Sequence, residues 1–329
     1  MAPRHHLVPQ MYLRRFADDR EHLAAVPRDA PDRVVSMVVR KAAAEVGFYA
    51  IPTEDLEPHA RGAHHPEVAE QALSGLESAC SGHIADMLRG GFPPRLEARF
   101  QLSAFIGLQY TRGRRFRRDL DDLARMTAPW FLQRELTPER VRDGLVAAGQ
   151  PAGPDDVADM LARLTGPDGP KPVLRRGHYV QHAFRNGIEE VGASLFVRSW
   201  RLLAFTRPCL LTSDEPVAVP TLDSRGPANV PALWFPLDRQ HALELSLTGS
   251  ETVVRPPLAK ARKINRIVAT QAEQWIFHHP LDTPLADLTI GPRHGLVEEV
   301  VEQVGQAGLV GQSRRLARRP LVDPAAQPP

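Results

Sequence analysis

Apolar residues at helical spacing form the clearest pattern in the first half of the chain. Over residues 67–89 they recur every three or four positions, which predicts a helix of about six turns. After Gly90 a second apolar series runs over residues 93–132, and the short connection predicts that the two helices pack antiparallel. Weaker patterns predict further helices at 4–19, 138–147, 155–164, 172–197, 257–275 and 296–303.

Strand patterns lie mostly towards the two ends of the chain. They predict strands at 22–27, 34–39, 200–206, 233–237 and 241–247. Over residues 207–217 an apolar run ends in Thr-Ser-Asp-Glu-Pro, which predicts a short buried strand with polar groups at its open end. The alternation of Leu243, Leu245 and Leu247 with more polar residues favours antiparallel pairing, because one face of the sheet is then solvated.

This distribution of elements predicts an α+β fold. Its middle is mainly helical, and strands of the N-terminal part and of the last third form a mostly antiparallel sheet. We expect a single domain over residues 1–290, with a peripheral helical insertion at 137–172, where weak helical patterns lie among Gly and Pro. For residues 291–329 we expect a short helix followed by a disordered tail rich in Arg, Pro and Ala.

The composition excludes several classes of protein. The chain has 329 residues, 43% of them hydrophobic and 24% charged, and no uncharged apolar run approaches the length of about 18 residues that a membrane-spanning helix needs. Residues 1–6 lack the apolar core of a secretory signal, so we expect a cytoplasmic protein with no membrane partner. Because lysine is rare beside arginine and proline is frequent, the composition indicates a GC-rich bacterial genome.

The sequence predicts neither a disulfide nor a metal site, and it identifies no cofactor. Cys80 and Cys209 are typical of small buried hydrophobic residues. Neighbouring histidines such as those at 278–279 lack the i,i+4 spacing that directs two rings to one ion, and no Cys-x-x-Cys is present. Walker, His-Glu-x-x-His, Gly-x-Gly-x-x-Gly and EF-hand patterns are also absent from the sequence.

Several motifs resemble, in order, those of the bacterial family catalogued as domain of unknown function 4238. The likeness spans roughly residues 4–277 and is carried by His5–Phe16, Leu108–Arg112, Leu211–Val217, Phe235–Leu237 and Ile264–Asn265. The family patterns are His-x-Val-Pro-x-x-Tyr-Leu-x-x-Phe, Gln-x-x-Arg and Thr-Ser-Asp-x-Pro-Val. Two departures are Glu215, where Asn or His is commoner, and Asp238, where Ser is usual. The resemblance implies a fold and candidate residues, and it brings no activity.

The polar members of these motifs are the candidate site. We assign catalysis to His5 and Asp214, because an imidazole titrates near neutral pH and a carboxylate orients it. The predicted substrate-binding residues, suited to an anionic group, are Gln10, Arg15, Gln109, Arg112, Ser213 and Asn265. The alternative is that His5 packs or caps the first helix and that Asp214 closes a turn or caps a backbone amide. Ser213 lacks the Gly-x-Ser-x-Gly elbow of a nucleophile.

Arginines are concentrated in the second long helix, at positions 112, 114, 115, 117 and 118. At helical spacing they spread around the helix, which predicts a solvated face paired with Asp119, Asp121 and Asp122. The alternative is a contact with the phosphate backbone of a nucleic acid.

Two functional hypotheses follow. The first is a hydrolase or nuclease-like enzyme that acts on an anionic substrate, either a phosphate-containing small molecule or a nucleic acid. The second is a non-catalytic binding or interaction protein, in which the motif residues form a buried polar network that fixes the N-terminal helix on the sheet. The first is favoured, because a structural network rarely needs so many buried charges. The oligomeric state is left open.

Overall fold

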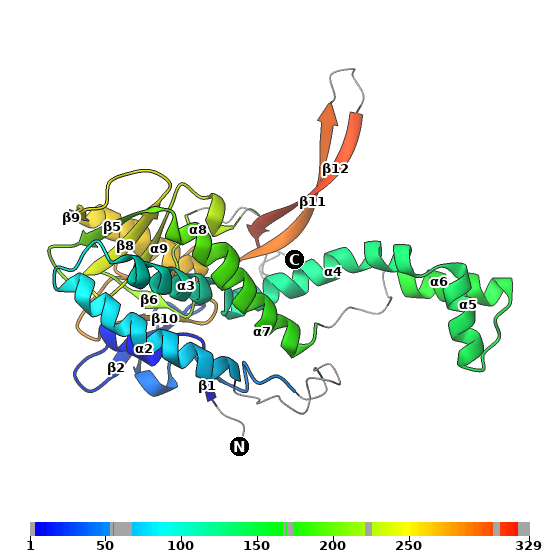
Figure 1. The fold of residues 1–329 in the computed structure, drawn as a ribbon, viewed down its shortest axis with the longest axis horizontal. Coiled ribbons are helices and arrows are strands. Elements are labelled where there is room, and N and C mark those ends of the chain that lie inside the picture. The colour runs from blue at the N-terminus through cyan, green and yellow to red at the C-terminus, as the bar shows by residue number, and fades with distance from the viewer. Residues whose placement is uncertain are drawn as a thin grey trace.

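A computed structural model describes residues 4–52, 55, 68–166, 169, 174–220, 226–304 and 310–321. It shows an α+β fold, as the distribution of patterns predicts. Helices and sheets form one body. Two parts project from it in different directions: a helical arm, formed by the helices within residues 114–165, and a β-hairpin, formed by residues 294–320 (Figure 1).

Two four-stranded sheets lie in the body. The first has the order β3-β2-β10-β6 and is antiparallel throughout, with β3 Val35–Val38, β2 His22–Pro27, β10 Trp275–His278 and β6 Thr212–Ser213. The second has the order β7-β8-β5-β9, with β7 Ala232–Pro236, β8 His241–Ser246, β5 Ser199–Ala204 and β9 Val253–Val254. Only β5 and β9 pair in parallel. The predicted pairing of N-terminal strands with strands of the last third is therefore confirmed.

In the N-terminal segment, the short helix predicted within residues 4–19, with Pro9 at its first position, forms directly after Pro9, whereas residues 4–6 are a strand. The segment begins with β1 (Arg4–His6), which pairs with β4 (Ala44–Val46), and continues as α1 (Gln10–Leu13) and the 3-10 helix η1 (Arg14–Phe16). Pro9, which has extended backbone angles, separates β1 from α1. A second 3-10 turn, η2, covers Val39–Lys41. The predicted apolar face is present, since Tyr12 and Phe16 are fully buried.

The core lies between the sheets and three helices, α2 (Val68–Leu88), α3 (Leu96–Thr111) and α9 (Leu258–Gln271). Tyr12 stacks on Phe235 of β7 with ring centroids 5.0 Å apart, and its hydroxyl lies 2.9 Å from the Thr212 hydroxyl. Phe105 of α3 meets the same Phe235 ring edge-on. One cluster of apolar side chains thus joins the first helix, both sheets and α3.

The helix predicted over 93–132 is interrupted. It forms α3 and then α4 (Arg114–Glu135), with Gly113 in extended conformation at the start of α4. Glu215 occupies the space that a Cβ of residue 113 would need. Glycine at this position therefore lets the turn between α3 and α4 lie directly against the segment that follows β6.

The helix predicted over 172–197 is interrupted as well. It consists of α7 (Arg176–Arg185), a π-helical segment η5 (Asn186–Gly192) and the short α8 (Ala193–Phe196). Glycines allow η5 to approach α3 closely, because a Cβ at Gly107 would collide with the carbonyl oxygen of Gly187. The Thr111 hydroxyl also reaches across and donates to the Ala183 carbonyl at 2.7 Å.

Two parts project from the body. The first turns of α4 lie against the body, and the rest of the arm continues through α5 (Pro138–Ala147) and α6 (Pro154–Thr165), which lie far from the sheets (Figure 1). The hairpin consists of β11 (His294–Val304) and β12 (Val310–Pro320). The prediction of a helix at 296–303 is therefore wrong, and residues 310–320 are a strand where a disordered tail was predicted. Residues 167–168, 170–173, 305–309 and 322–329, which the predicted insertion and tail include, lie outside the described residues.

Candidate functional site

Three motif residues are linked through Tyr49. The backbone N–H of Tyr49 donates to Nδ1 of the buried His5 at 2.7 Å, and the two rings stack with centroids 5.6 Å apart. The Tyr49 hydroxyl donates to the Arg112 carbonyl at 3.3 Å. With the Gln109 amide oriented so that its oxygen faces Arg112, that oxygen accepts from Nη2 and Nε at 2.5 and 3.0 Å. Arg112 also binds Glu77 at 2.8 Å. The structure therefore brings His5, Gln109 and Arg112 together.

The group around Tyr49 is nearly closed to a ligand. Arg112 is 2% exposed, and the hollow that it lines with Tyr49, Phe116 and Arg117 has a volume of about 10 Å³. Such a volume holds about one water molecule.

Asp214 serves the backbone at the beginning of β10. Its carboxylate accepts hydrogen bonds from the backbone N–H groups of Glu273, Gln274 and Trp275, at 2.9, 2.8 and 3.3 Å. Burial raises the pKa of Asp214 to about 6, while these N–H groups and the Arg114 charge oppose the rise. Asp214 thus has the geometry of the predicted alternative, a carboxylate that caps backbone amides.

Ser213 and Asn265 also bind backbone groups. The Ser213 hydroxyl accepts from the Glu215 N–H at 3.0 Å and faces the Val268 carbonyl of α9 at 3.5 Å. Asn265 accepts from the Leu211 N–H at 3.2 Å and donates to the Cys209 carbonyl at 2.8 Å. Both side chains join α9 to the segment around β6. Asn265 in addition lines a surface cavity of about 330 Å³ beside residues 281–287.

Gln10 and Arg15 lie apart from these residues. The Gln10 side chain accepts from Arg14 Nη2 at 3.3 Å at the surface of α1. Arg15 donates from Nη2 to the Ser81 carbonyl of α2 at 3.0 Å. Across the described ranges, neither side chain forms a hydrogen bond or ion pair with Asp214, Ser213 or Asn265. The roles assigned to all eight residues stay predictions.

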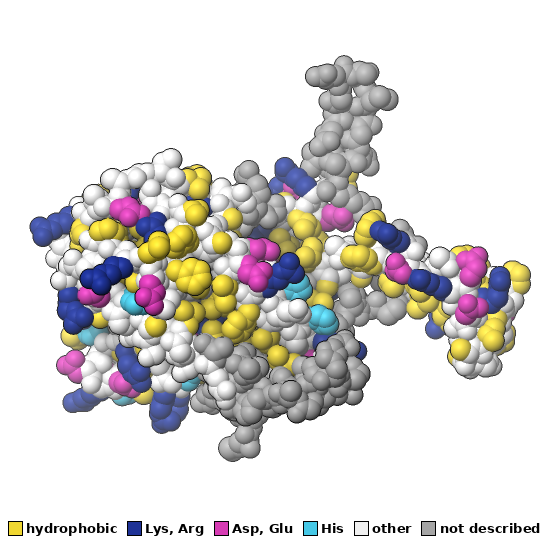
Figure 2. Space-filling model, in the orientation of Figure 1, with side chains coloured by type: hydrophobic (Ala, Val, Ile, Leu, Met, Phe, Trp, Pro, Cys, Tyr) yellow, Lys and Arg dark blue, Asp and Glu magenta, His cyan; other side chains and the backbone are white. Residues whose placement is uncertain are grey.

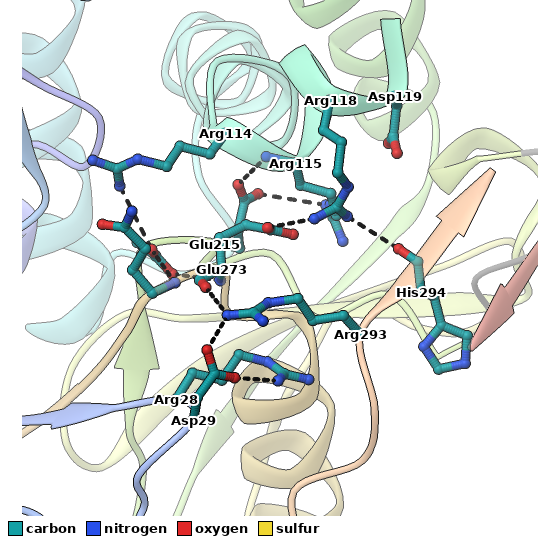
Figure 3. Close-up of polar contacts among 12 residues, drawn as sticks. Arg28, Asp29, Arg114, Arg115, Arg118, Asp119, Glu215, Glu273, Arg293 and His294 are labelled. Carbon is teal, nitrogen blue, oxygen red and sulfur yellow. Dashed lines mark hydrogen bonds and ion pairs between the residues drawn. The ribbon is translucent and has the colours of Figure 1, made fainter. Parts of the chain in front are cut away.

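The prediction of a solvated arginine face is wrong. Arg114 binds Glu45 at 2.8 Å. Arg118 binds Glu273 at 2.5 Å and the His294 carbonyl at 3.0 Å (Figure 3). Arg117 lies over the Phe48 ring, 3.7 Å from its centroid. The predicted partners bind elsewhere, since Asp119 pairs with Arg318 and Asp121 accepts from the Tyr179 hydroxyl. The helix turns about 100° per residue, so its arginines reach different neighbours, and these neighbours bury most of them.

A cavity of about 300 Å³ opens beside the first turns of α4, residues 115–123. Its other walls come from η5, from the 3-10 turn η6 (Pro227–Asn229) and from the hairpin. We call it the Arg115 cavity. Its apolar walls include Phe116, Leu120, Leu123, Val191, Leu296 and Leu316. Its polar side chains are those of Tyr110, Thr111, Arg115, Asp119, Asn186, Glu190 and Arg318. A concave, mostly apolar site with a few polar groups is the usual form of a small-molecule site.

Arg115 is held in place on two sides. Its guanidinium lies over the Tyr110 ring at 4.7 Å, and its backbone N–H donates to Glu215 Oε1 at 3.0 Å. Arg115 Nη2 lies 3.7 Å from Glu215 Oε2, which is an ion-pair distance and too long for a hydrogen bond. The Arg115 side chain is 4% exposed, and its Nη1 has no hydrogen-bond partner within the part of the chain that the structure describes.

Glu215 lies behind Arg115 and is 1% exposed. Burial raises the pKa of this carboxyl to about 8; the Arg115 charge opposes the rise and the neighbouring Asp214 adds to it. A raised pKa favours the neutral form of the carboxyl, and this weakens its charge pairing with Arg115.

Neither Arg115 nor Glu215 is among the residues assigned from the motifs. Two signals in the sequence pointed towards them, the density of arginine in α4 and the departure from the family pattern at Glu215. The hairpin residues that complete the cavity gave no such signal.

The family described as protein of unknown function (DUF4238) matches residues 4–282. The chain belongs to this family. The DUF4238 match includes both four-stranded sheets and ends before β11, so the hairpin wall of the Arg115 cavity lies outside it. No curated protein and no solved structure matches the chain.

Two further findings concern ions and membranes. Among the described residues of this DUF4238 protein, no three or more His, Cys, Asp or Glu side chains are grouped so that they could hold a metal ion. No helix within the described ranges is both long and apolar enough to cross a membrane.

Proposed function

We propose that this protein binds an anionic small molecule in the Arg115 cavity. The observation that carries the proposal is that the nearly buried Arg115 guanidinium forms no hydrogen bond with the described residues, while the Arg115 side chain lines a cavity of about 300 Å³. A guanidinium carries five N–H donors, and leaving a buried charged donor unpaired costs about 1–3 kcal/mol or more. An anion in the cavity would offer acceptors to this guanidinium.

The other two hollows give less support to a ligand. The cavity of about 330 Å³ beside Asn265 is lined by Asp282, which already binds Arg239 through two hydrogen bonds of 2.7 Å. Among its described lining residues, none has a buried polar atom that lacks a partner. The hollow beside Arg112 has room for about one water molecule.

The contacts of the predicted catalytic residues favour binding over hydrolysis. His5 accepts from one backbone N–H group and Asp214 from three, so both already have structural partners. Figure 2 shows basic and acidic side chains interspersed over one face of the molecule, without the broad basic patch that a nucleic-acid surface needs. A hydrolase or nuclease-like enzyme is therefore the second candidate, kept because three of the polar motif residues, His5, Gln109 and Arg112, converge around Tyr49.

Thermal unfolding and calorimetry test the proposal. The ligands are organic carboxylates, phosphates and sulfonates in which the same apolar group carries each of the three anionic groups. We expect at least one class of anion to raise the melting temperature of the wild type, because a ligand that binds only the folded state stabilises it. Arg115→Gln removes the unpaired donor and should abolish the shift.

Arg118→Gln is the matched control. Arg118 lies three residues along α4, and its partners Glu273 and His294 lie outside the cavity lining, so this variant should keep the shift. The proposal fails if no anion stabilises the wild type, or if Arg115→Gln responds like the wild type. Chemical conversion of the bound anion, followed by mass spectrometry, would show that the enzyme hypothesis is the better one.

A further inference from the structure

We infer that the ligand of the Arg115 cavity is a monocarboxylate with an apolar body. The inference rests on the proposed function and names the chemical class of the ligand. Three features carry it: a single uncommitted positive charge among the described residues of the cavity lining, the acidic groups around that charge, and the apolar walls.

The positive charge is single because the second arginine of the lining is already paired. Arg318 donates to both carboxylate oxygens of Asp119, one of them at 2.9 Å. A bidentate pair of this kind is among the strongest polar contacts of a protein, so Arg318 has little capacity left for a ligand. Arg118 lies nearby on α4 and is committed to Glu273 (Figure 3). Among the described residues of the lining, Arg115 is therefore the cation available to an anion.

The counter-charge behind Arg115 is weak. Glu215 is the carboxyl found beside Arg115, and at 3.7 Å from Nη2 it forms no hydrogen bond with the guanidinium, while burial favours its neutral form. One unit of negative charge from the ligand is enough to balance a single guanidinium. A carboxylate, which carries one negative charge at this pH, meets that requirement.

A phosphate monoester fits the same surroundings less well. It carries about 1.5 to 2 negative charges at pH 7. Its second charge would lie in a cavity whose lining also holds the carboxyl groups of Asp119 and Glu190. The Thr111 hydroxyl is already used, because it lies 2.7 Å from the Ala183 carbonyl and 3.2 Å from the Gly107 carbonyl. Repulsion from the acidic groups therefore lowers the affinity for phosphate relative to carboxylate.

The rest of the cavity suits an apolar body. Phe116, Leu120 and Leu123 of α4 face side chains of η5 and of the hairpin across the space. Each CH₂ group that moves from water into such surroundings tightens binding about fourfold. Apolar area therefore supplies affinity, and the carboxylate fixes which end of the ligand lies at Arg115.

The test compares three head groups on two apolar bodies. The probes are nonanoate, octyl phosphate and 1-octanol, which share an octyl chain, together with 3-phenylpropanoate, 2-phenylethyl phosphate and 2-phenylethanol, which share a phenylethyl group. Binding to the full-length protein is measured by calorimetry and by melting temperature at pH 7. We expect at least one carboxylate to bind about tenfold or more tightly than the phosphate and the alcohol on the matched body, since a charge-assisted hydrogen bond is worth about one such factor.

Two variants locate the site. Arg115→Gln should lower the affinity for the carboxylate to that for the matched alcohol, whereas Arg118→Gln should leave it unchanged. Ala228→Trp adds a large side chain at an exposed position of the cavity lining, where folding is little affected, and should block both carboxylates and alcohols. Ala228→Trp keeps the inference testable if Arg115→Gln does not fold.

The outcomes separate the inference from the proposed function. Tighter binding of a phosphate than of its matched carboxylate, lost in Arg115→Gln or Ala228→Trp, would overturn the carboxylate class and leave anion binding at this cavity standing. If no probe binds, or if carboxylates bind equally well to both cavity variants, the inference and the proposed function fail together.

Discussion

At the residue scale, buried charges in this protein are compensated largely by backbone dipoles. Asp214 receives three backbone N–H groups. Arg198, which is 2% exposed, donates to the Val230 and Ala228 carbonyls at 2.9 and 2.8 Å and to the Pro227 carbonyl at 3.1 Å. Arg198 thereby fixes η6, the turn that forms one wall of the Arg115 cavity. A polar side chain in a motif can thus serve folding while it resembles a catalytic group.

Glu215 gives a prediction about pH. Its pKa rises from the ordinary 4.5 of a glutamate to about 8 in the fold, so between these values the folded protein holds a proton that the unfolded chain has released. Raising the pH through this window therefore favours the unfolded state, by roughly 1.4 kcal/mol for each unit of pKa shift. Glu215→Gln removes the titrating group and keeps an oxygen for the Arg115 N–H.

The measurement is urea unfolding of both proteins between pH 5 and pH 9. The free energy of unfolding of the wild type minus that of Glu215→Gln should fall as the pH rises to about 8, by a few kcal/mol in all, and then become constant. Taking the difference cancels the titration of Asp214 to first order. Parallel curves for the two proteins would show that Glu215 does not hold its proton in the fold.

The sequence predicted much about single residues but not their partners. Tyr12 and Phe16 were assigned correctly to a buried face, because two aromatic residues one turn apart must pack on something. The alternative role of Asp214, capping backbone amides, corresponds to its three hydrogen bonds. Arg115 could not be distinguished from its neighbouring arginines, since burial at one position of α4 depends on elements far along the chain.

At the element scale, the close contact between the backbones of α3 and η5 depends on glycine residues, which have no Cβ. Gly107, Gly187 and Gly192 allow the two backbones to meet, and this contact places Asn186, Glu190 and Val191 beside the first turns of α4. A π-helical segment is an uncommon conformation that occurs often at functional sites. Here it forms one wall of the Arg115 cavity.

Gly107→Ala should destabilise the protein. The new Cβ would collide with the Gly187 carbonyl oxygen, and backbone cannot move aside as a flexible side chain does. Overpacking of this kind costs about 1–3 kcal/mol. The matched control is Gly82→Ala in α2, where no other atom lies within 4 Å of the added Cβ. There alanine should raise the free energy of unfolding by about 0.5–1 kcal/mol, because its helix propensity exceeds that of glycine. Urea unfolding of both variants checks the pair, and equal effects of the same sign would contradict this account.

The sequence predicted regular elements better than their interruptions. The strand at 22–27 has the predicted bounds, and α2 lies within the predicted helix at 67–89. The segment 296–303 was misassigned because its valines and one leucine occur at spacings that also fit a helix. Valine's preference for strands would have been the better guide. The break at Gly113 arises from Glu215, about a hundred residues away, and local periodicity contains no information about it.

At the scale of the whole molecule, the α+β class followed from the order of the elements alone. The DUF4238 family match over residues 4–282 covers both four-stranded sheets and the helices that pack on them. The hairpin follows the matched region and completes the Arg115 cavity with Leu296, Leu316 and Arg318. Its role could not be predicted, since a two-stranded projection buries little apolar surface and its second strand is rich in arginine.

The projecting arm has a consequence for how the molecule scatters X-rays in solution. A compact chain of 329 residues has a radius of gyration of about 20 Å. The 22 residues of α4 form a rod of about 33 Å that carries α5 and α6 away from the body, and the hairpin extends in another direction. Small-angle scattering should therefore give a larger radius and a distance distribution with a long tail. A symmetric distribution near the compact value would mean that the arm folds back onto the body.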